Sequence, residues 1–232
     1  MRSGAVAELM RLFVTGTDTE VGKTQVSAAL LHLCRQAGWS AVGMKPVAAG
    51  SRTHAGRESN EDVDLLTAAS SIALPEALIN PYLFRPAIAP HIAAAEVGIS
   101  IDLAHIEACY QRLCAQAQAI VVEGAGGFLL PLGSNQDGGD LAQRLGLPVV
   151  LVVGMRLGCL NHALLTAEAI ARRGLTLAGW VANRITPEMP RFDENLATLL
   201  GSLPAPLLGV VPFLPDPDPL KVASYLTLPL VQ

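Results

Sequence analysis

Short, unbroken runs of apolar residues recur along this 232-residue chain, and segments with helical spacing of apolar residues separate them. An unbroken apolar strand has both faces buried, as in a parallel sheet that helices cover on both sides. Strands that alternate with helices are joined by crossover connections. We therefore predict one doubly wound, mostly parallel α/β sheet. The predicted strands cover residues 12–15, 41–44, 120–122, 149–153, 177–182 and 207–211, and the predicted helices cover 25–37, 102–117, 160–173 and 191–200.

The chain shows no internal repeat and no linker long enough to divide it. We therefore expect residues 11–232 to form a single domain, preceded by a flexible N-terminal extension over residues 1–10. Residues 50–60 are rich in turn formers and are expected to be a mobile loop over the carboxyl edge of the sheet. The Pro-rich tail after Pro212 is expected to wrap the surface.

Composition excludes several classes of function. A chain that is 51% hydrophobic and only 16% charged is not intrinsically disordered. Its longest apolar run, residues 149–153, is far shorter than the ~20 residues of a membrane span. The net charge of -4 argues against a nucleic-acid partner. The four cysteines form no CxxC pair and fit reduced thiols, so we expect a cytoplasmic protein without membrane or nucleic-acid partners.

One glycine-containing segment lies where a predicted strand ends and a predicted helix begins. This is the context of a phosphate-binding loop, in which glycines turn backbone N–H groups inward and the helix N-terminus adds positive charge. Five residues separate the two glycines where four are common. We expect Lys23 to reach the β and γ phosphates and the Thr24 hydroxyl to bind Mg²⁺. The predicted nucleotide-binding residues are Gly16, Thr17, Asp18, Thr19, Glu20, Val21, Gly22, Lys23 and Thr24.

Lysine is rare in this chain: only Lys23, Lys45 and Lys221 occur among its 16 basic residues. Lys45 follows the predicted strand 41–44, and the carboxyl ends of parallel strands meet at one edge of the sheet. A second ammonium there suits a reaction that develops negative charge on transferred phosphate. We therefore predict that Lys45 belongs to the same site as the phosphate loop.

Two acidic residues are candidates for the same edge. Glu123 follows the predicted strand 120–122, where a carboxylate commonly completes the Mg²⁺ site of a phosphate loop. The glycines after it, including Gly126, allow a substrate to approach the backbone closely. Spacing alone makes Asp62 an acid in the first turn of a helix, which the macrodipole favours.

Taken together, these motifs resemble the dethiobiotin synthetase family. The matching segments are residues 13–24, 45–47, 122–127, 157–163 and 177–183, so the resemblance extends from about residue 11 to 213. It implies a P-loop NTPase-like fold and an ATP-dependent ligase of biotin biosynthesis. In that reaction CO₂ carboxylates one amine of 7,8-diaminopelargonate (7,8-diaminononanoate). The carbamate then takes the γ-phosphoryl group of ATP, and the second amine closes a cyclic urea to give dethiobiotin, ADP and phosphate.

The resemblance also implies roles for individual residues. Lys23, Lys45 and Thr19 would be catalytic, and Thr24, Asp62 and Glu123 would bind Mg²⁺. Asn183 would read the amino edge of adenine. The residues implied at the substrate are Thr19, Glu20, Lys45, Gly126, Gly158, Cys159 and Asn161, the last three as a helix N-terminus that holds the substrate's carboxylate. Family dimers place this helix against the partner's site, so a homodimer with active sites near the interface is implied.

Two features depart from the family's pattern: Ala49 replaces a residue that often carries a hydroxyl, and residues 133–139 differ. A different class of protein is also considered, namely a P-loop switch or partitioning ATPase. Such proteins usually carry an additional lysine near the start of the loop, and residues 16–21 contain none. A synthase ATPase domain linked to a glutaminase is a third possibility, but no glutaminase portion follows in this chain.

Overall fold

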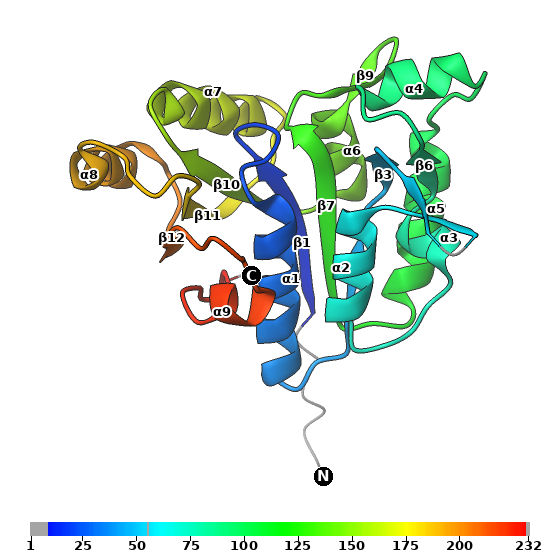
Figure 1. Ribbon diagram of the computed structural model, residues 1–232, viewed down its shortest axis with the longest axis horizontal. Coiled ribbons are helices and arrows are strands. Elements are labelled where there is room, and N and C mark those ends of the chain that lie inside the picture. Colours follow the sequence, from blue (N-terminus) through cyan, green and yellow to red (C-terminus); the bar gives the residue numbers. More distant parts are fainter. Residues whose placement is uncertain (1–8, 55, 231–232) are drawn as a thin grey trace.

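A six-stranded sheet forms the centre of the computed structural model, which describes residues 9–54 and 56–230 (Figure 1). Its strand order is β12-β11-β10-β1-β7-β2, and each neighbouring pair is parallel. The doubly wound parallel sheet predicted from the apolar runs is therefore confirmed. The strands are β1 (Met10–Gly16), β2 (Ala41–Met44), β7 (Ala119–Gly127), β10 (Val149–Met155), β11 (Leu177–Arg184) and β12 (Leu207–Val211).

Helices cover both faces of this sheet. One face carries α1 (Lys23–Gln36), α2 (Glu61–Ala69) and α9 (Pro219–Ala223), which lie in front of the sheet in Figure 1. The other face carries the remaining longer helices. These are α5 (Leu103–Cys114), α6 (Gly138–Leu145), α7 (Cys159–Arg172) and α8 (Phe192–Ser202), and the shorter helices α3 (Glu76–Ile79) and α4 (Pro90–Glu96) lie beyond β2.

Strand β1 shows why the apolar runs are unbroken. Successive side chains of a strand point to opposite faces. Leu12 and Val14 therefore pack with α1 and α9, whereas Phe13 packs into the cluster on the opposite face. All three are at most 1% exposed. Because both faces of the sheet are covered, both sets of positions are mainly apolar.

Most main elements begin and end within a few residues of their predicted bounds, but β7 continues five residues beyond its predicted end at residue 122, so Glu123 lies inside the strand instead of after it. The extension predicted over residues 1–10 is wrong at its end, since β1 already begins at Met10; residues 1–8 lie outside the described residues. The tail after Pro212 lies against the body of the protein: α9 packs on α1, and Leu226 bridges to Gly209 of β12.

The prediction of a loop over residues 50–60 is wrong. Strands β4 (Arg52–His54) and β5 (Arg57–Ser59) pair there as an antiparallel hairpin, and Arg57 forms ion pairs with Asp64 and Glu76. Strands of three residues are too short to show an alternating pattern. For the same reason the sequence did not reveal β3 (Val47–Ala49), β6 (Tyr82–Phe84), β8 (Pro131–Gly133) and β9 (Gln136–Asp137).

Helix α6 was also missed, although its ends carry recognisable signals. Asp137 and Asp140 form a reciprocal capping box at its start, and Gly146 ends it in the left-handed conformation. The divergent residues 133–139 lead directly into this helix. In the part of the chain that the structure describes, no helix combines the length and apolar character needed to cross a membrane.

The close approach of the C-terminal segment to β12 gives a stability prediction. A Cβ atom on Gly209 would lie 1.9 Å from the backbone oxygen of Tyr225. Gly209→Ala should therefore displace this segment and lower the free energy of unfolding by about 1–3 kcal/mol in a urea titration. Gly201→Ala is the matched control, because α8 leaves that position open and alanine favours helix. Equal stability of Gly209→Ala and the wild type would contradict the prediction.

Candidate active site

The predicted phosphate loop connects β1 to α1, as its sequence context required. Gly22 caps α1 with a φ of 90°, a conformation that favours glycine. The loop is anchored by Val21, which is 1% exposed. A Cβ atom on Gly16 or on Gly154 of β10 would lie 2.6 Å from the Val21 side chain. These glycines therefore leave room for Val21 beneath the loop.

Lys23 lies at the first position of α1 and bends back along the loop. Its Nζ donates a 2.8 Å hydrogen bond to the backbone oxygen of Asp18. Burial, with the positive charge of Lys45 as a second cause, lowers the pKa of Lys23 to about 8. No carboxylate bonds directly to Lys23 among the described residues, so its ammonium is available to an anionic ligand in the cavity.

Lys45 bonds to two carboxylates that come from different elements. Its Nζ lies 2.8 Å from Oδ2 of Asp62 in the first turn of α2 and 2.5 Å from Oε1 of Glu123 on β7. Lys45 is 4% exposed and Glu123 is fully buried. Burial by itself would lower the pKa of Lys45, but the charges of Glu123 and Asp62 outweigh it and raise this pKa. The Lys45 charge in turn lowers the pKa of Asp62 against the effect of burial.

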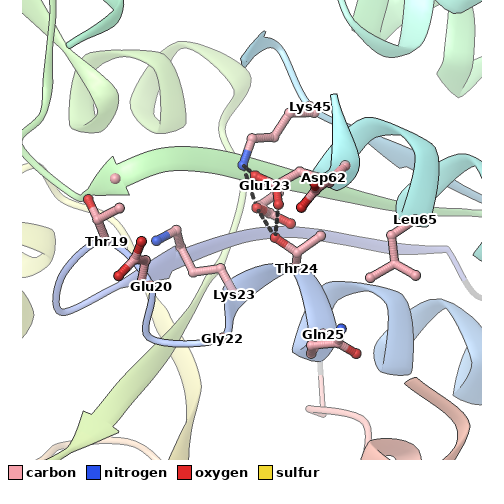
Figure 2. Close-up of a pocket in the computed structure, with 12 residues that line it drawn as sticks. Thr19, Glu20, Gly22, Lys23, Thr24, Gln25, Lys45, Asp62, Leu65 and Glu123 are labelled. Carbon is pink, nitrogen blue, oxygen red and sulfur yellow. Dashed lines mark hydrogen bonds and ion pairs between the residues drawn. The ribbon is translucent and has the colours of Figure 1, made fainter. Parts of the chain in front are cut away.

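Thr24 brings a third oxygen to the same point (Figure 2). Its Oγ1 lies 2.8 Å from Oδ1 of Asp62 and 3.0 Å from Oε1 of Glu123. A hydroxyl has a single hydrogen, so it serves only one of these acceptors at a time. Buried Oε2 of Glu123 has no hydrogen-bond partner in the described part of the protein. Hard oxygen atoms, the kind of ligand that Mg²⁺ prefers, therefore converge here beside the Lys45 ammonium.

The loop and this cluster line one cavity of about 360 Å³. A second cavity of about 180 Å³ lies on the other side of the phosphate loop and shares Glu20, Gly22 and Gln25 with the first. Asn183 lines the second cavity, where its amide nitrogen donates to the Val21 backbone oxygen at 2.8 Å. The first cavity is lined by Thr19, Glu20, Gly22, Lys23, Thr24, Gln25, Lys45, Glu61, Asp62, Leu65, Glu123 and Gly126.

Not every predicted site residue reaches these cavities. Gly158, Cys159 and Asn161 line neither of them within one chain. The Cys159 N–H donates to the backbone oxygen of Arg156 at 3.0 Å, and its side chain is buried. Thr17 is held by β10, since its N–H donates to Val152 and its hydroxyl accepts from the Gly154 N–H.

Some lining residues were absent from the sequence-based prediction. Gln25 and Leu65 line the first cavity, and Arg184, Val211 and Phe213 line the second. Arg184 ends β11, and Val211 ends β12. The rule that ligands bind at the carboxyl ends of parallel strands would have found them. Gln25 and Leu65 lie inside helices and carry no comparable signal.

The fold belongs to a known class. MinD, the septum site-determining protein of Pyrococcus horikoshii, solved with Mg-ADP, aligns with 88% of this chain and 81% of its own at 16% identity and a TM-score of 0.50. The MinC:MinD complex of Aquifex aeolicus gives a TM-score of 0.52 at 12% identity, with 96% of this chain and 99% of the other covered. These similarities show the fold alone, and the chain is a P-loop NTPase-like α/β protein.

Proteins related in sequence identify the family more narrowly than the fold does. The family described as an AAA domain matches residues 10–220. The ATP-dependent dethiobiotin synthetase BioD of Aromatoleum aromaticum is 59% identical over 217 residues, 94% of this chain and 96% of the relative. The protein of the same name from Janthinobacterium is 52% identical over 218 residues, covering 92% of each. The chain therefore belongs to the family of ATP-dependent dethiobiotin synthetases.

The lowered pKa of Lys23 gives a chemical prediction. Only the neutral amine attacks an acylating reagent, and its fraction rises as pH increases through the pKa. In the ligand-free folded protein, acetic anhydride should modify Lys23 with a pH midpoint of about 8. After unfolding the midpoint should rise towards the ordinary lysine pKa of 10.5, which peptide mass mapping measures. The same midpoint in both states would show that burial does not perturb this amine.

Proposed function

We propose that the chain carboxylates and cyclises 7,8-diaminononanoate with CO₂ and ATP, giving dethiobiotin, ADP and phosphate. The observation that carries this proposal is a single cavity in which the phosphate loop, two lysines and the oxygen cluster of Thr24, Asp62 and Glu123 meet. Relatives at 52–59% identity support the particular substrate. The similarity to MinD does not favour a partitioning role, because it lies at 12–16% identity.

The proposed reaction has three steps. One amine of the substrate attacks CO₂ and loses a proton, which gives a carbamate anion. A carbamate oxygen then attacks the γ-phosphorus of ATP, the bond to the β-γ bridging oxygen breaks, and ADP leaves. The second amine attacks the carbonyl carbon of the resulting carbamic–phosphoric anhydride, phosphate leaves with the C–O bond electrons, and loss of a proton completes the ring.

The two lysines suit the second step, which brings the carbamate anion to a triphosphate. Phosphoryl transfer is accelerated chiefly by positioning and by stabilising the charge on transferred oxygens. Lys23 lies in the phosphate loop and Lys45 faces it across the cavity, as Figure 2 shows. We propose that Lys23 and Lys45 stabilise this charge. Thr19 and Glu20, which line the same cavity, hold the diamine.

We propose Mg²⁺ as the metal of this site, held by Thr24, Asp62 and Glu123. Mg²⁺ prefers oxygen ligands. The Thr24 oxygen lies 2.8 and 3.0 Å from the two carboxylate oxygens, and Oε2 of Glu123 has no hydrogen-bond partner among the described residues, so these groups would supply oxygen ligands to the metal. A metal there would neutralise phosphate charge and orient the β and γ phosphates. In this proposal Asp62 has two roles: it is an acid in the first turn of α2, and it is a ligand of the metal.

The second cavity suits the adenine ring of ATP. The side-chain nitrogen of Asn183 donates a hydrogen bond to the Val21 backbone oxygen. Its Oδ1 therefore remains as the acceptor for the exocyclic amino group of the base. Val211 and Phe213 add apolar lining at and beyond the end of β12, and Arg184 at the end of β11 adds a cation. Because this cavity adjoins the phosphate loop, one nucleotide can extend through both.

We also propose a homodimer whose active sites lie near the subunit interface. Its support is a group of exposed apolar side chains around α7, with Leu157 at 99% exposed, Leu165 at 55% and Leu129 at 52%. Contiguous exposed apolar surface commonly marks an interaction site. Residues 158–161 begin α7 beside this group, so a partner's site there would receive the N–H groups of Leu160 and Asn161, whereas that of Cys159 bonds to the Arg156 backbone oxygen. The four free cysteines fit a reducing, cytoplasmic setting.

The dimer prediction is tested by sedimentation velocity. The wild-type chain should sediment as a dimer with and without ATP, and Leu165→Asp should shift it towards monomer because it charges the apolar surface. Leu220→Asp is the matched control, since Leu220 is 57% exposed on α9, on the opposite face of the sheet. A monomeric wild type, or assembly only with ATP, would contradict the proposal and favour a switch protein.

The reaction is tested by single turnover with isotope-labelled CO₂, the diamine and Mg-ATP. The label should appear in a cyclic urea, and ADP should form only when the diamine is present. Lys23→Ala should reduce the rate by at least about 10²-fold, the scale of losing one charge-stabilising group. This variant leaves no buried carboxylate without its hydrogen-bond partner, because Lys23 bonds only to a backbone oxygen.

Lys221→Ala, on the exposed surface of α9, is the control for this experiment. Chelation of divalent cations should abolish product formation with the wild type. Rapid ATP hydrolysis without the diamine, or the absence of labelled urea with it, would refute the proposed reaction.

A further inference from the structure

The phosphate loop contains acidic residues although its proposed ligand is a polyanion. Residues 16–24 carry Asp18, Glu20 and Lys23, a formal charge of -2 + 1 = -1. Asp18 is part of the loop's own framework: Oδ1 accepts the Thr19 N–H at 2.8 Å, and its backbone oxygen accepts Nζ of Lys23. Its negative charge cannot turn away from the loop without breaking the first of these bonds.

Arg156 is the residue that meets this charge. It follows the last residue of β10, Met155, and its guanidinium donates to Oδ2 of Asp18. The same strand end holds the loop twice more: the Thr17 N–H donates to the Val152 oxygen at 3.0 Å, and the Gly154 N–H donates to the Thr17 hydroxyl at 3.3 Å. Arg156 is therefore the charged member of a three-point attachment between β10 and the phosphate loop.

We propose that Arg156 is a positioning residue for nucleotide binding, which neutralises Asp18 and holds the loop against β10 so that it accepts the triphosphate. The inference deepens the proposed function, on which it depends for the identity of the ligand. With Arg156 included, the formal charge around the loop rises from -1 to zero. Neither the glycine pattern nor the lysines of the site point to this residue.

The Arg156–Asp18 ion pair affects nucleotide affinity more than the stability of the fold. The side chains of Arg156 and Asp18 are 46% and 44% exposed, and ion pairs with that much solvent contribute little to stability. A triphosphate in the loop, however, is repelled by Asp18 whenever Arg156 is absent. At the effective dielectric of a partly exposed site this repulsion corresponds to a loss of about three- to tenfold in affinity, and salt screens it.

The experiment is a double-mutant cycle on nucleotide binding. Isothermal titration calorimetry with a non-hydrolysable ATP analogue and Mg²⁺ measures Kd for the wild type, Arg156→Met, Asp18→Asn and the double variant. Asparagine keeps an acceptor for the Thr19 N–H but removes the charge. Arg156→Met should raise Kd about three- to tenfold at low salt and less at high salt. In the Asp18→Asn background the same change should raise Kd less than twofold.

Steady-state kinetics and a matched variant complete the test. Arg156→Met should raise KM for ATP more than it lowers kcat, and Arg156→Lys should recover most of the affinity because it restores the charge. Arg172→Met removes the arginine of another exposed ion pair, with Glu168, about 20 Å away at the other end of α7, and should leave Kd unchanged.

Two results would overturn the inference. One is an unchanged Kd for Arg156→Met while the wild type binds the analogue. The other is an equal loss in the Asp18→Asn background, which would mean that Arg156 acts without Asp18. A wild type that fails to bind the analogue would instead overturn the proposed function together with the inference.

Discussion

A buried ammonium group between two carboxylates connects the parts of this site. Lys45 directly follows β2, Glu123 belongs to β7, and Asp62 lies in the first turn of α2. A fully buried carboxylate such as Glu123 costs several kcal/mol without a partner. Each charge therefore requires the other, and their pairing fixes the edge of the sheet relative to α2 and to Thr24 at the start of α1.

This charge cluster is better explained by chemistry than by stability. Replacing a buried ion pair with apolar residues of similar volume is often neutral or stabilising. The surrounding sheet already supplies an extensive apolar core on both faces. Charges retained at its carboxyl edge, with an unpartnered Glu123 oxygen among them, are suited to a metal ion and a polyanionic ligand.

The phosphate loop depends on neighbours that are distant in sequence. Val21 packs where Gly154 of β10 leaves space, and Asn183 of β11 donates to the Val21 oxygen. A Cβ atom on Gly22 would lie 2.2 Å from the Asn183 amide nitrogen. Gly22 is therefore needed beside a side chain more than 150 residues away, and the Asn183 amide couples the loop to the second cavity.

The long, buried strands and their helices could be predicted because an unbroken apolar run has a direct physical cause, burial on both faces. Strand ends also placed Lys45 and Glu123 at one edge. The hairpin over residues 52–59 could not be predicted, because strands of three residues show no period and are held here by pairing and by ion pairs to α2 and α3. Asp62 was ambiguous, since a first-turn acid satisfies the helix dipole whether or not it binds anything else.

The sequence by itself determined the parallel α/β sheet, the phosphate loop at the end of β1, and the family, because these depend on local apolar runs and on a contiguous motif. Only the tertiary structure decided which polar groups meet: Lys45 with Asp62 and Glu123, Asn183 with Val21, and Arg156 with Asp18. The reason is that such contacts join strands, helices and loops separated by up to 162 residues, and no local pattern records them.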